Sequence, residues 1–185
     1  MAEKVISAPF TDEIVTSLRS GDKVFINGVI YTGRDAAHKR LAELLEKGKE
    51  LPVDLRGQAM YYVGPAPAKP GQAIGSCGPT TSYRMDAYTP VLLQYGLKVM
   101  LGKGARNEAV KEAMKKYKAV YLAVVGGAAA LLAKCVTKAE IVAYEDLGPE
   151  AIYRLEVENL PAIVINDCYG GDLYEEGRQQ WAVNK

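Results

Sequence analysis

Residues 97–125 read LKVMLGKGARNEAVKEAMKKYKAVYLAVV and predict a strand, a helix and a second strand in succession. Residues 97–101 and 119–125 are short and largely apolar, which is typical of buried strands. Residues 106–117 between them have the length and composition of a helix. This βαβ-like unit predicts a mixed α/β fold.

Upstream of this unit, strand and helix signals alternate irregularly. Residues 23–32 are rich in β-branched and aromatic side chains, and Asn27-Gly28 in their middle predicts a β-hairpin. Residues 35–47 place apolar side chains at close to helical spacing, which predicts an amphipathic helix ended by Gly48. Residues 60–63 predict a short strand, and the proline-rich residues 64–71 predict an irregular connector.

Downstream, Gly126-Gly127 leads into a short helical segment, residues 128–133. The glycines lack the spacing of a dinucleotide or phosphate loop, so a closely packed glycine turn is favoured. Three further strands are predicted, with boundaries at Gly148-Pro149 and Leu160-Pro161. These strands cover residues 139–144, 152–157 and 162–165.

The composition predicts one globular domain spanning residues 1–185, since a chain that is 49% hydrophobic can bury a core without cross-links. Its 23 basic and 22 acidic side chains nearly cancel, so no global field favours nucleic acid or an anionic membrane. The N-terminus lacks the apolar region of a signal peptide, and no apolar run is long enough to span a bilayer. We therefore expect a cytoplasmic protein.

The cysteines, Cys77, Cys135 and Cys168, are odd in number and widely separated, which fits neither a disulfide framework nor a metal clip. Neighbouring N–H groups could lower the pKa of Cys77, but no activating histidine or second cysteine stands near it, so a spectator role is favoured. The single histidine, His38, has no partners with metal-ligand spacing. We therefore predict reduced thiols and no metal site on this chain.

Residues 78–86 read GPTTSYRMD and gather hydroxyls, a guanidinium and a carboxylate behind a Gly-Pro turn. Thr80 or Thr81 is expected to cap a helix running to residue 95 and kinked at Pro90, whose free N–H groups would hold an anion. The alternative is an ordinary capped helix with an exposed Arg84. These residues alone support the two interpretations equally.

Two further polar clusters follow predicted strands or glycine turns, where side chains are held rigidly yet remain reachable. Arg34 would bind a carboxylate through its planar fork, with Asp35 capping the following helix. Lys103, between two glycines, would meet an anion as a point charge. Singly, each is better explained as a helix cap or a solvated lysine; together with Arg84 they favour a site for a small dicarboxylate.

Four segments carry a resemblance to a known family: TGRDAAHKR (32–40), GPTTSYRMD (78–86), LGKG (101–104) and VGGAA (125–129). They resemble the β subunit of the iron-sulfur hydro-lyases, which comprise class I fumarases and L-tartrate dehydratases. The resemblance covers nearly the whole chain. It implies a swivelling β/β/α domain, a partner α subunit whose cysteines hold a [4Fe-4S] cluster, and a dimer of αβ pairs.

The resemblance also implies roles for individual residues. Arg34, Arg84 and Lys103 would grip the substrate carboxylates, and Thr81 would support the same loop. Thr80 would lie beside the carbon that loses a proton. A free hydroxyl is a poor base near neutral pH, so we expect an activating group from the α chain.

Two residues are expected to support the site without touching substrate. Asp86 follows Arg84 by two residues, too close for a same-face helical pair, so it is expected to hold a loop or to cap a neighbouring amide. His38 is expected to orient Arg34 or the helix start, which is favoured over a catalytic role.

The implied reaction is reversible loss of water from a 2-hydroxy dicarboxylate, with the cluster iron acting as a Lewis acid on the leaving hydroxyl. Fumarate and (S)-malate are the favoured pair. Tyr83 stands where many fumarases of the family have a small residue, which leaves an L-tartrate dehydratase β subunit as an alternative. A non-catalytic anion-binding domain is the alternative of a different class, disfavoured because all four catalytic and carboxylate-binding side chains are present.

Overall fold

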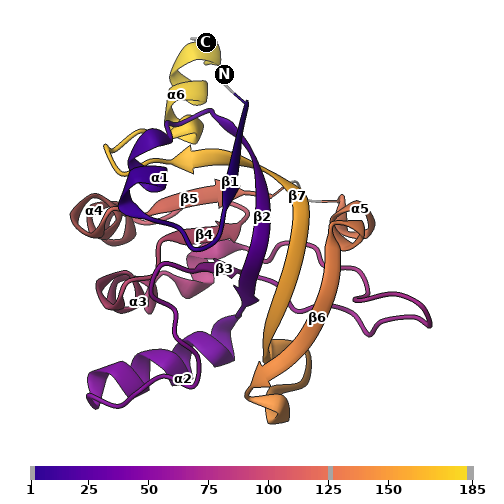
Figure 1. The fold of residues 1–185 in the computed structure, drawn as a ribbon. Helices are drawn as coiled ribbons and strands as arrows, with labels where there is room; N and C mark the ends of the chain where they lie inside the picture. Colours follow the sequence, from indigo (N-terminus) through magenta and orange to yellow (C-terminus); the bar gives the residue numbers. More distant parts are fainter. Residues whose placement is uncertain (1–2, 125–126, 183–185) are drawn as a thin grey trace.

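The computed structural model describes residues 3–124 and 127–182 (Figure 1). In chain order the elements, with 3-10 helices written η, are β1 (Glu3–Ser7), α1 (Asp12–Ser17), β2 (Lys23–Thr32), α2 (Asp35–Glu46), β3 (Ala59–Tyr61), η1 (Ser82–Met85), α3 (Thr89–Tyr95), β4 (Val99–Gly102), α4 (Glu108–Tyr117), β5 (Val120–Ala123), α5 (Ala129–Lys134), β6 (Val136–Ala143), η2 (Glu145–Glu150), β7 (Ile152–Asn166) and α6 (Leu173–Trp181). The predicted mixed α/β class is confirmed.

Five strands close into a barrel in the order β2-β3-β4-β5-β7, because β7 pairs with β2 as well as with β5. Strands β2 to β5 run parallel to one another, and β7 runs antiparallel to β2 and β5, which it joins. Outside the ring, β1 adds to β2 and β6 adds to β7. The predicted βαβ unit is confirmed as β4, α4 and β5.

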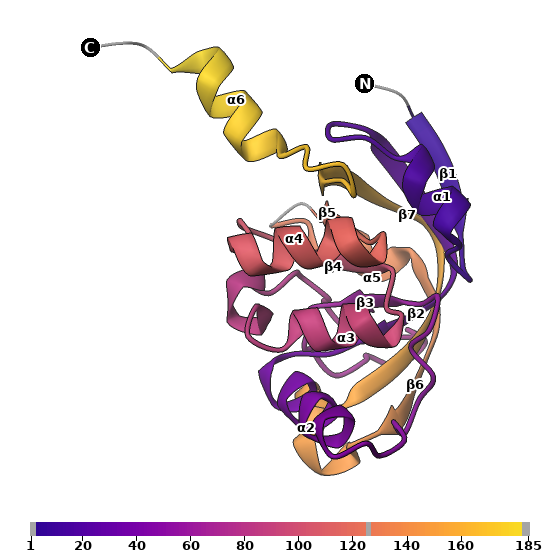
Figure 2. The same ribbon diagram turned by 90° about the vertical axis from the view of Figure 1, so that its left-hand side faces the viewer.

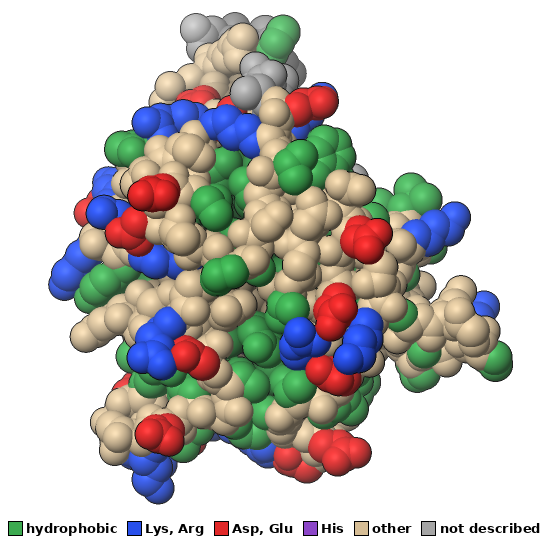
Figure 3. All heavy atoms as spheres, in the orientation of Figure 1, with side chains coloured by type: hydrophobic (Ala, Val, Ile, Leu, Met, Phe, Trp, Pro, Cys, Tyr) green, Lys and Arg blue, Asp and Glu red, His purple; other side chains and the backbone are tan. Residues whose placement is uncertain are grey.

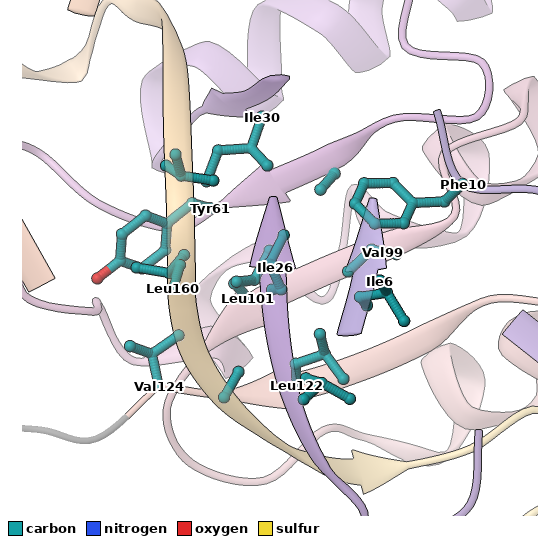
Figure 4. Packing of buried hydrophobic residues seen from close by; sticks show 14 of the residues in the cluster. Ile6, Phe10, Ile26, Ile30, Tyr61, Val99, Leu101, Leu122, Val124 and Leu160 are labelled. Atoms are coloured by element: carbon teal, nitrogen blue, oxygen red, sulfur yellow. The ribbon is translucent and has the colours of Figure 1, made fainter. Parts of the chain in front are cut away.

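On β3, β4 and β5, successive side chains point alternately into the barrel and toward the helices, as the pleat of a strand requires. The interior cluster is seen in Figure 4 and includes Ile26, Ile30, Tyr61, Val99, Leu101, Leu122 and Leu160. The alternate residues Met60, Met100 and Tyr121 face outward and pack in a second cluster with side chains of α2, α3 and α4. Figure 2 shows these three helices stacked along one side of the sheet. Burial on both faces explains why these strands appear in the sequence as apolar runs.

Figure 3 shows the side of the molecule on which β2 and β7 lie in front, where hydrophobic side chains gather near the middle and charged ones are scattered around them. Phe25, Pro161 and Ile163 line a shallow apolar cavity of about 170 Å³ in this region. Among the described residues, no helix is long and apolar enough to cross a membrane.

The hairpin predicted within residues 23–32 is wrong, because β2 is one continuous strand. Gly28 has a φ of 94°, which here forms a bulge against β7 instead of a turn. The side-chain oxygen of Asn27 accepts a hydrogen bond from the Asn159 amide at 2.8 Å, and its carbonyl accepts one from the Ala8 amide at 3.1 Å. The Asn27-Gly28 pair therefore forms a bend in β2 where β2 pairs with β7.

The boundary predicted at Leu160-Pro161 is also wrong, because residues 152–157 and 162–165 belong to the single strand β7. Pro161 lies between the part of β7 that pairs with β6 and the part that pairs with β5. A residue without an N–H is tolerated where one side of the ladder is interrupted.

The single kinked helix predicted after Thr80 is divided into η1 and α3, and Pro90 lies in the first turn of α3, where it is readily accommodated. Thr81 precedes η1 but its side chain makes no capping hydrogen bond. The helix predicted from residue 35 is confirmed as α2, and Gly48, with a φ of 63°, follows its end. Val125 and Gly126 of the predicted glycine turn lie outside the described residues. The swivelling of the domain stays a prediction.

Candidate functional site

The four parallel strands of the barrel end at one rim, and the predicted site residues follow these ends. Arg34 lies two residues after β2, and Lys103 directly follows β4. The segment from Gly78 to Asp86 lies against the residues that follow β3 and β4. In α/β proteins, ligands bind outside the carboxyl ends of the strands. The structure therefore supports a site at this rim.

Backbone hydrogen bonds fix residues 78–86, called the Thr80 loop below, to the rim. The Thr80 amide donates to the carbonyl of Tyr62 at 2.6 Å, and the Lys103 amide donates to the carbonyl of Thr80 at 3.3 Å. The Ser82 amide in turn donates to the carbonyl of Lys103 at 2.8 Å, and Thr81 and Lys103 form a parallel bridge. Three predicted site residues, Thr80, Thr81 and Lys103, are thus brought side by side.

Arg84 is joined to the start of α2 by a two-point ion pair. Its Nε donates to Oδ1 of Asp35 at 2.9 Å, and its second terminal nitrogen lies 2.8 Å from Oδ2. The prediction that Asp35 caps α2 is wrong, because Asp35 is the first helical residue and its carboxylate holds Arg84 instead. This pair connects the Thr80 loop with the segment that carries Arg34.

Arg34 has a different partner. Its Nε lies 3.3 Å from Oε1 of Glu150 and, although buried, makes no hydrogen bond of good geometry with any described residue. A Cβ added at Gly64 would lie 2.7 Å from a terminal nitrogen of Arg34, so a glycine is needed there to leave room for the guanidinium. Glu150, at the end of η2, was not identified from the sequence, although the resemblance included its segment.

His38 contacts the Arg34 segment, and its expected role in orienting that segment stays a prediction. Its Nδ1 lies 2.8 Å from the carbonyl oxygen of Arg34, which can only accept, so Nδ1 carries the proton. The ring is fully buried and meets the Tyr62 ring edge-on at 5.1 Å. This burial lowers the pKa of His38 to about 4, so the imidazole is neutral at physiological pH.

Lys103 and Thr80 present free groups. The Lys103 side chain is exposed and, within residues 3–124 and 127–182, has no ion-pair partner, whereas Arg34 and Arg84 each have one. The hydroxyl of Thr80 likewise makes no hydrogen bond to the described part of the chain. Tyr83, on the outside of the same loop, is 66% exposed. Among the described residues, the rim therefore carries an unpaired ammonium and a free hydroxyl, while its two guanidinium groups face Glu150 and Asp35.

Asp86 is buried and does cap an amide, as expected. One of its oxygens accepts a hydrogen bond from the Asn107 amide at 2.8 Å, and the other accepts one from Nε of Arg106 at 2.7 Å. Arg106 was not identified from the sequence, where it marked only the beginning of a helix. No local spacing connects residues 86 and 106, so no sequence signal could have revealed the pair.

The chain's own thiols do not fit as ligands of a metal cluster. Burial raises the pKa of Cys77 to about 11, and burial is also the main cause that raises the pKa values of Cys135 and Cys168. Cluster ligands must be thiolates, which these surroundings disfavour. The described residues contain no group of three or more His, Cys, Asp or Glu side chains that could hold a metal ion.

Comparison with known proteins places this rim in context. The family model described as Fumarase C-terminus matches residues 3–177. The chain is 42% identical over 156 residues to "Fumarate hydratase class I, anaerobic" of Escherichia coli, which covers 83% of this chain and 28% of that protein. The figures are the same for "Fumarate hydratase 1, mitochondrial" of Leishmania major. This chain is also 40% identical over 172 residues to "Putative L(+)-tartrate dehydratase subunit beta" of Methanocaldococcus jannaschii, and the match covers 90% of this chain and 88% of the archaeal subunit.

The relatives thus fall into two size classes. The chain spans 28% of the length of both fumarate hydratases and nearly the whole length of the archaeal subunit. The identities are almost equal, so similarity alone does not distinguish the two activities.

Proposed function

The chain belongs to the Fumarase C-terminus family, and we propose that it is the β subunit, or C-terminal part, of a hydro-lyase that interconverts fumarate and (S)-malate. The observation that carries the proposal is the grouping of Arg34, Arg84 and Lys103 with a free threonine hydroxyl at one rim of the barrel. A dicarboxylate needs two cationic anchors, and guanidinium groups match the geometry of a carboxylate.

The binding roles follow from the ion pairs of the free chain. Arg34 and Arg84 already face carboxylates, those of Glu150 and Asp35, so their guanidinium groups are held in carboxylate-binding positions. Lys103 has no such partner among the described residues and is the cation most available to a substrate. We assign one substrate carboxylate to the arginines and the other to Lys103.

Thr80 is assigned to the carbon that loses a proton. Its backbone is fixed on both sides, by the Tyr62 carbonyl and the Lys103 amide, so its hydroxyl is held in place at the rim. An ordinary hydroxyl needs a base to accept its proton, and His38 is buried beneath the segment that carries Arg34. We therefore propose that the activating group and the [4Fe-4S] cluster both belong to a partner α subunit, in a dimer of αβ pairs.

A second candidate is the β subunit of an L-tartrate dehydratase. It is favoured by the similarity to the archaeal subunit over 88% of that protein's length. The exposed side chain of Tyr83 stands on the substrate-binding loop and would contribute a hydroxyl to a substrate with two hydroxyl groups. A pocket built to pair such groups discriminates strongly against a substrate that lacks them.

The deciding experiment is anaerobic co-expression with the cluster-bearing chain, followed by assays of fumarate hydration and of tartrate dehydration. We expect fumarate turnover, lost in Arg84→Ala and retained in Arg56→Ala. Arg56 is a matched control, because it forms a similar two-point ion pair with Asp54, and both of these side chains are more than half exposed.

Three outcomes separate the candidates. Turnover of tartrate but not of fumarate would identify the second candidate. The Tyr83→Gly variant should then turn over tartrate more slowly. A complex that holds its cluster but turns over neither acid would refute the hydro-lyase proposal. Binding of fumarate by such an inactive complex, measured by calorimetry, would instead support an anion-binding domain.

A further inference from the structure

We infer that Arg106 is a positioning residue, which holds the Thr80 loop and the segment after Lys103 in a fixed relation across the rim. The activity test of this inference rests on the proposed function, but the contacts that motivate it do not. Arg106 lies three residues after Lys103, and its side chain is fully buried. It therefore cannot touch a substrate at the rim.

The guanidinium joins three separate segments of the chain. Its Nε donates to Asp86 at 2.7 Å, on the Thr80 loop, and one terminal nitrogen donates to the hydroxyl of Thr89 at 2.8 Å, at the start of α3. The other terminal nitrogen donates to the hydroxyl of Tyr62 at 3.2 Å, directly after β3. A lysine offers a single point of charge and cannot keep this planar fork.

Two tyrosine rings enclose the same guanidinium. Its central carbon lies 5.3 Å from the centre of the Tyr62 ring and 5.0 Å from that of the Tyr121 ring, within the range of cation–π attraction. Burial disfavours the charge, but Tyr62 and Asp86 outweigh it and raise the pKa of Arg106. The arginine is therefore charged and rigidly enclosed.

A second bridge, through Tyr121, also joins the Thr80 loop to the segment after Lys103. The hydroxyl of Tyr121 lies 2.8 Å from Oγ of Ser82 and donates to the carbonyl of Gly104 at 2.8 Å. One residue of the bridge is thus on the Thr80 loop and the other directly follows Lys103. The Arg106 and Tyr121 contacts act on the same pair of segments from beneath the rim.

Two of the residues that Arg106 contacts, Asp86 and Tyr62, lie next to proposed site residues. Asp86 is two residues from Arg84, and the carbonyl of Tyr62 accepts the Thr80 amide. A buried ion pair adds little stability compared with apolar residues of similar volume. The Arg106–Asp86 pair is better explained by the geometry that it fixes, because misplacing binding groups by a fraction of an ångström weakens substrate binding.

The test uses variants that separate geometry from stability. Arg106→Lys keeps the charge but loses the fork, and the double variant Asp86→Asn/Arg106→Met removes both buried charges, so that neither is left unpaired. Lys111→Met is the matched control. It deprives the buried carboxylate of Asp172, at the start of α6, of its ion-pair partner at 2.7 Å.

Three quantities are measured for each variant: the denaturant midpoint of the isolated chain, KM and kcat for fumarate in the reconstituted complex, and hydrogen exchange at the Ser82 and Lys103 amides. We expect Arg106→Lys to raise KM about tenfold, the equivalent of about 1.4 kcal/mol of binding. Exchange at both amides should accelerate. The double variant should behave similarly, and Lys111→Met should change neither KM nor these exchange rates.

The inference is overturned if Arg106→Lys lowers the midpoint as Lys111→Met does while KM and the two exchange rates stay at their wild-type values. If the wild-type complex turns over no acid, the proposed function has failed, and exchange in the isolated chain decides alone. Faster exchange at both amides in Arg106→Lys, but not in Lys111→Met, then supports the positioning role. Equal exchange in the two variants refutes it.

Discussion

The stability of the fold should fall between pH 7 and pH 5 because of one side chain, His38. This residue is the only histidine in the chain, so no other imidazole titrates in this interval. Its pKa is lowered from 6.5 to about 4 mainly because the ring is buried and the charged form is poorly solvated. The folded chain therefore holds His38 neutral, whereas the unfolded chain protonates it.

The sign and the size follow from proton linkage. Between pH 4 and 6.5 the unfolded state binds more protons, so stability is fully present above pH 6.5 and is lost as the pH falls toward 4. The two pKa values give a loss of about 2 kcal/mol between pH 7 and pH 5. That is a large fraction of the 5–15 kcal/mol by which a domain is typically stable.

The comparison is with His38→Asn, which keeps an N–H donor for the Arg34 carbonyl but has no group that titrates in this range. Urea unfolding followed by far-ultraviolet circular dichroism at pH 7, 6 and 5 measures the free energy of unfolding of both proteins. The carboxylates titrate in both and cancel in the difference. Equal pH dependence of the two proteins, or an imidazole pKa near 6.5 by NMR in the folded chain, would refute the reasoning.

Three substitutions at the rim give further expectations. Arg84→Ala should lower kcat/KM for the dicarboxylate by about 100-fold, through the loss of a charge-assisted pair, while the free energy of unfolding changes by less than about 1 kcal/mol, as for exposed ion pairs. Lys103→Met should lower kcat/KM similarly without moving the urea midpoint, and near-normal turnover would remove Lys103 from the site. Gly102→Ala should destabilise the chain by about 1–3 kcal/mol, since an added Cβ collides with Oγ of Ser82, and an unchanged midpoint would show that the loop moves aside.

The sequence predicts the elements whose signals are local. The βαβ unit is predicted from short apolar runs on either side of a helical segment, and the helix from residue 35 from periodic apolar side chains followed by Gly48; both are present, as β4, α4 and β5 and as α2. Barrel closure has no local signal, because β2 and β7 are separated by more than 100 residues. Asn27-Gly28 misleads for a related reason: a positive φ serves a hairpin turn and a bulge equally well, and only the distant partner strand decides.

The same distinction separates the site residues that were predicted from those that were missed. Arg34, Arg84 and Lys103 were identifiable because each cation follows a turn or a strand end. Arg106 and Glu150 were not, because their importance comes from partners 20 and 116 positions away in the chain. Ion pairs between residues far apart in the chain depend on the fold, and no spacing rule in the sequence encodes them.

The ion pairs that the rim forms without substrate indicate how it would bind a dianion. A guanidinium taken out of water loses hydration, but Arg34 and Arg84 each already face a carboxylate of the chain. A substrate carboxylate that displaces Asp35 or Glu150 replaces one ion pair with another. Lys103 is different, because it has no ion-pair partner among the described residues and would gain one only when the substrate binds. We therefore expect the two arginines to set the orientation of the substrate and Lys103 to set much of the dependence of affinity on ionic strength, since its ion pair with the substrate is a newly formed one that salt screens.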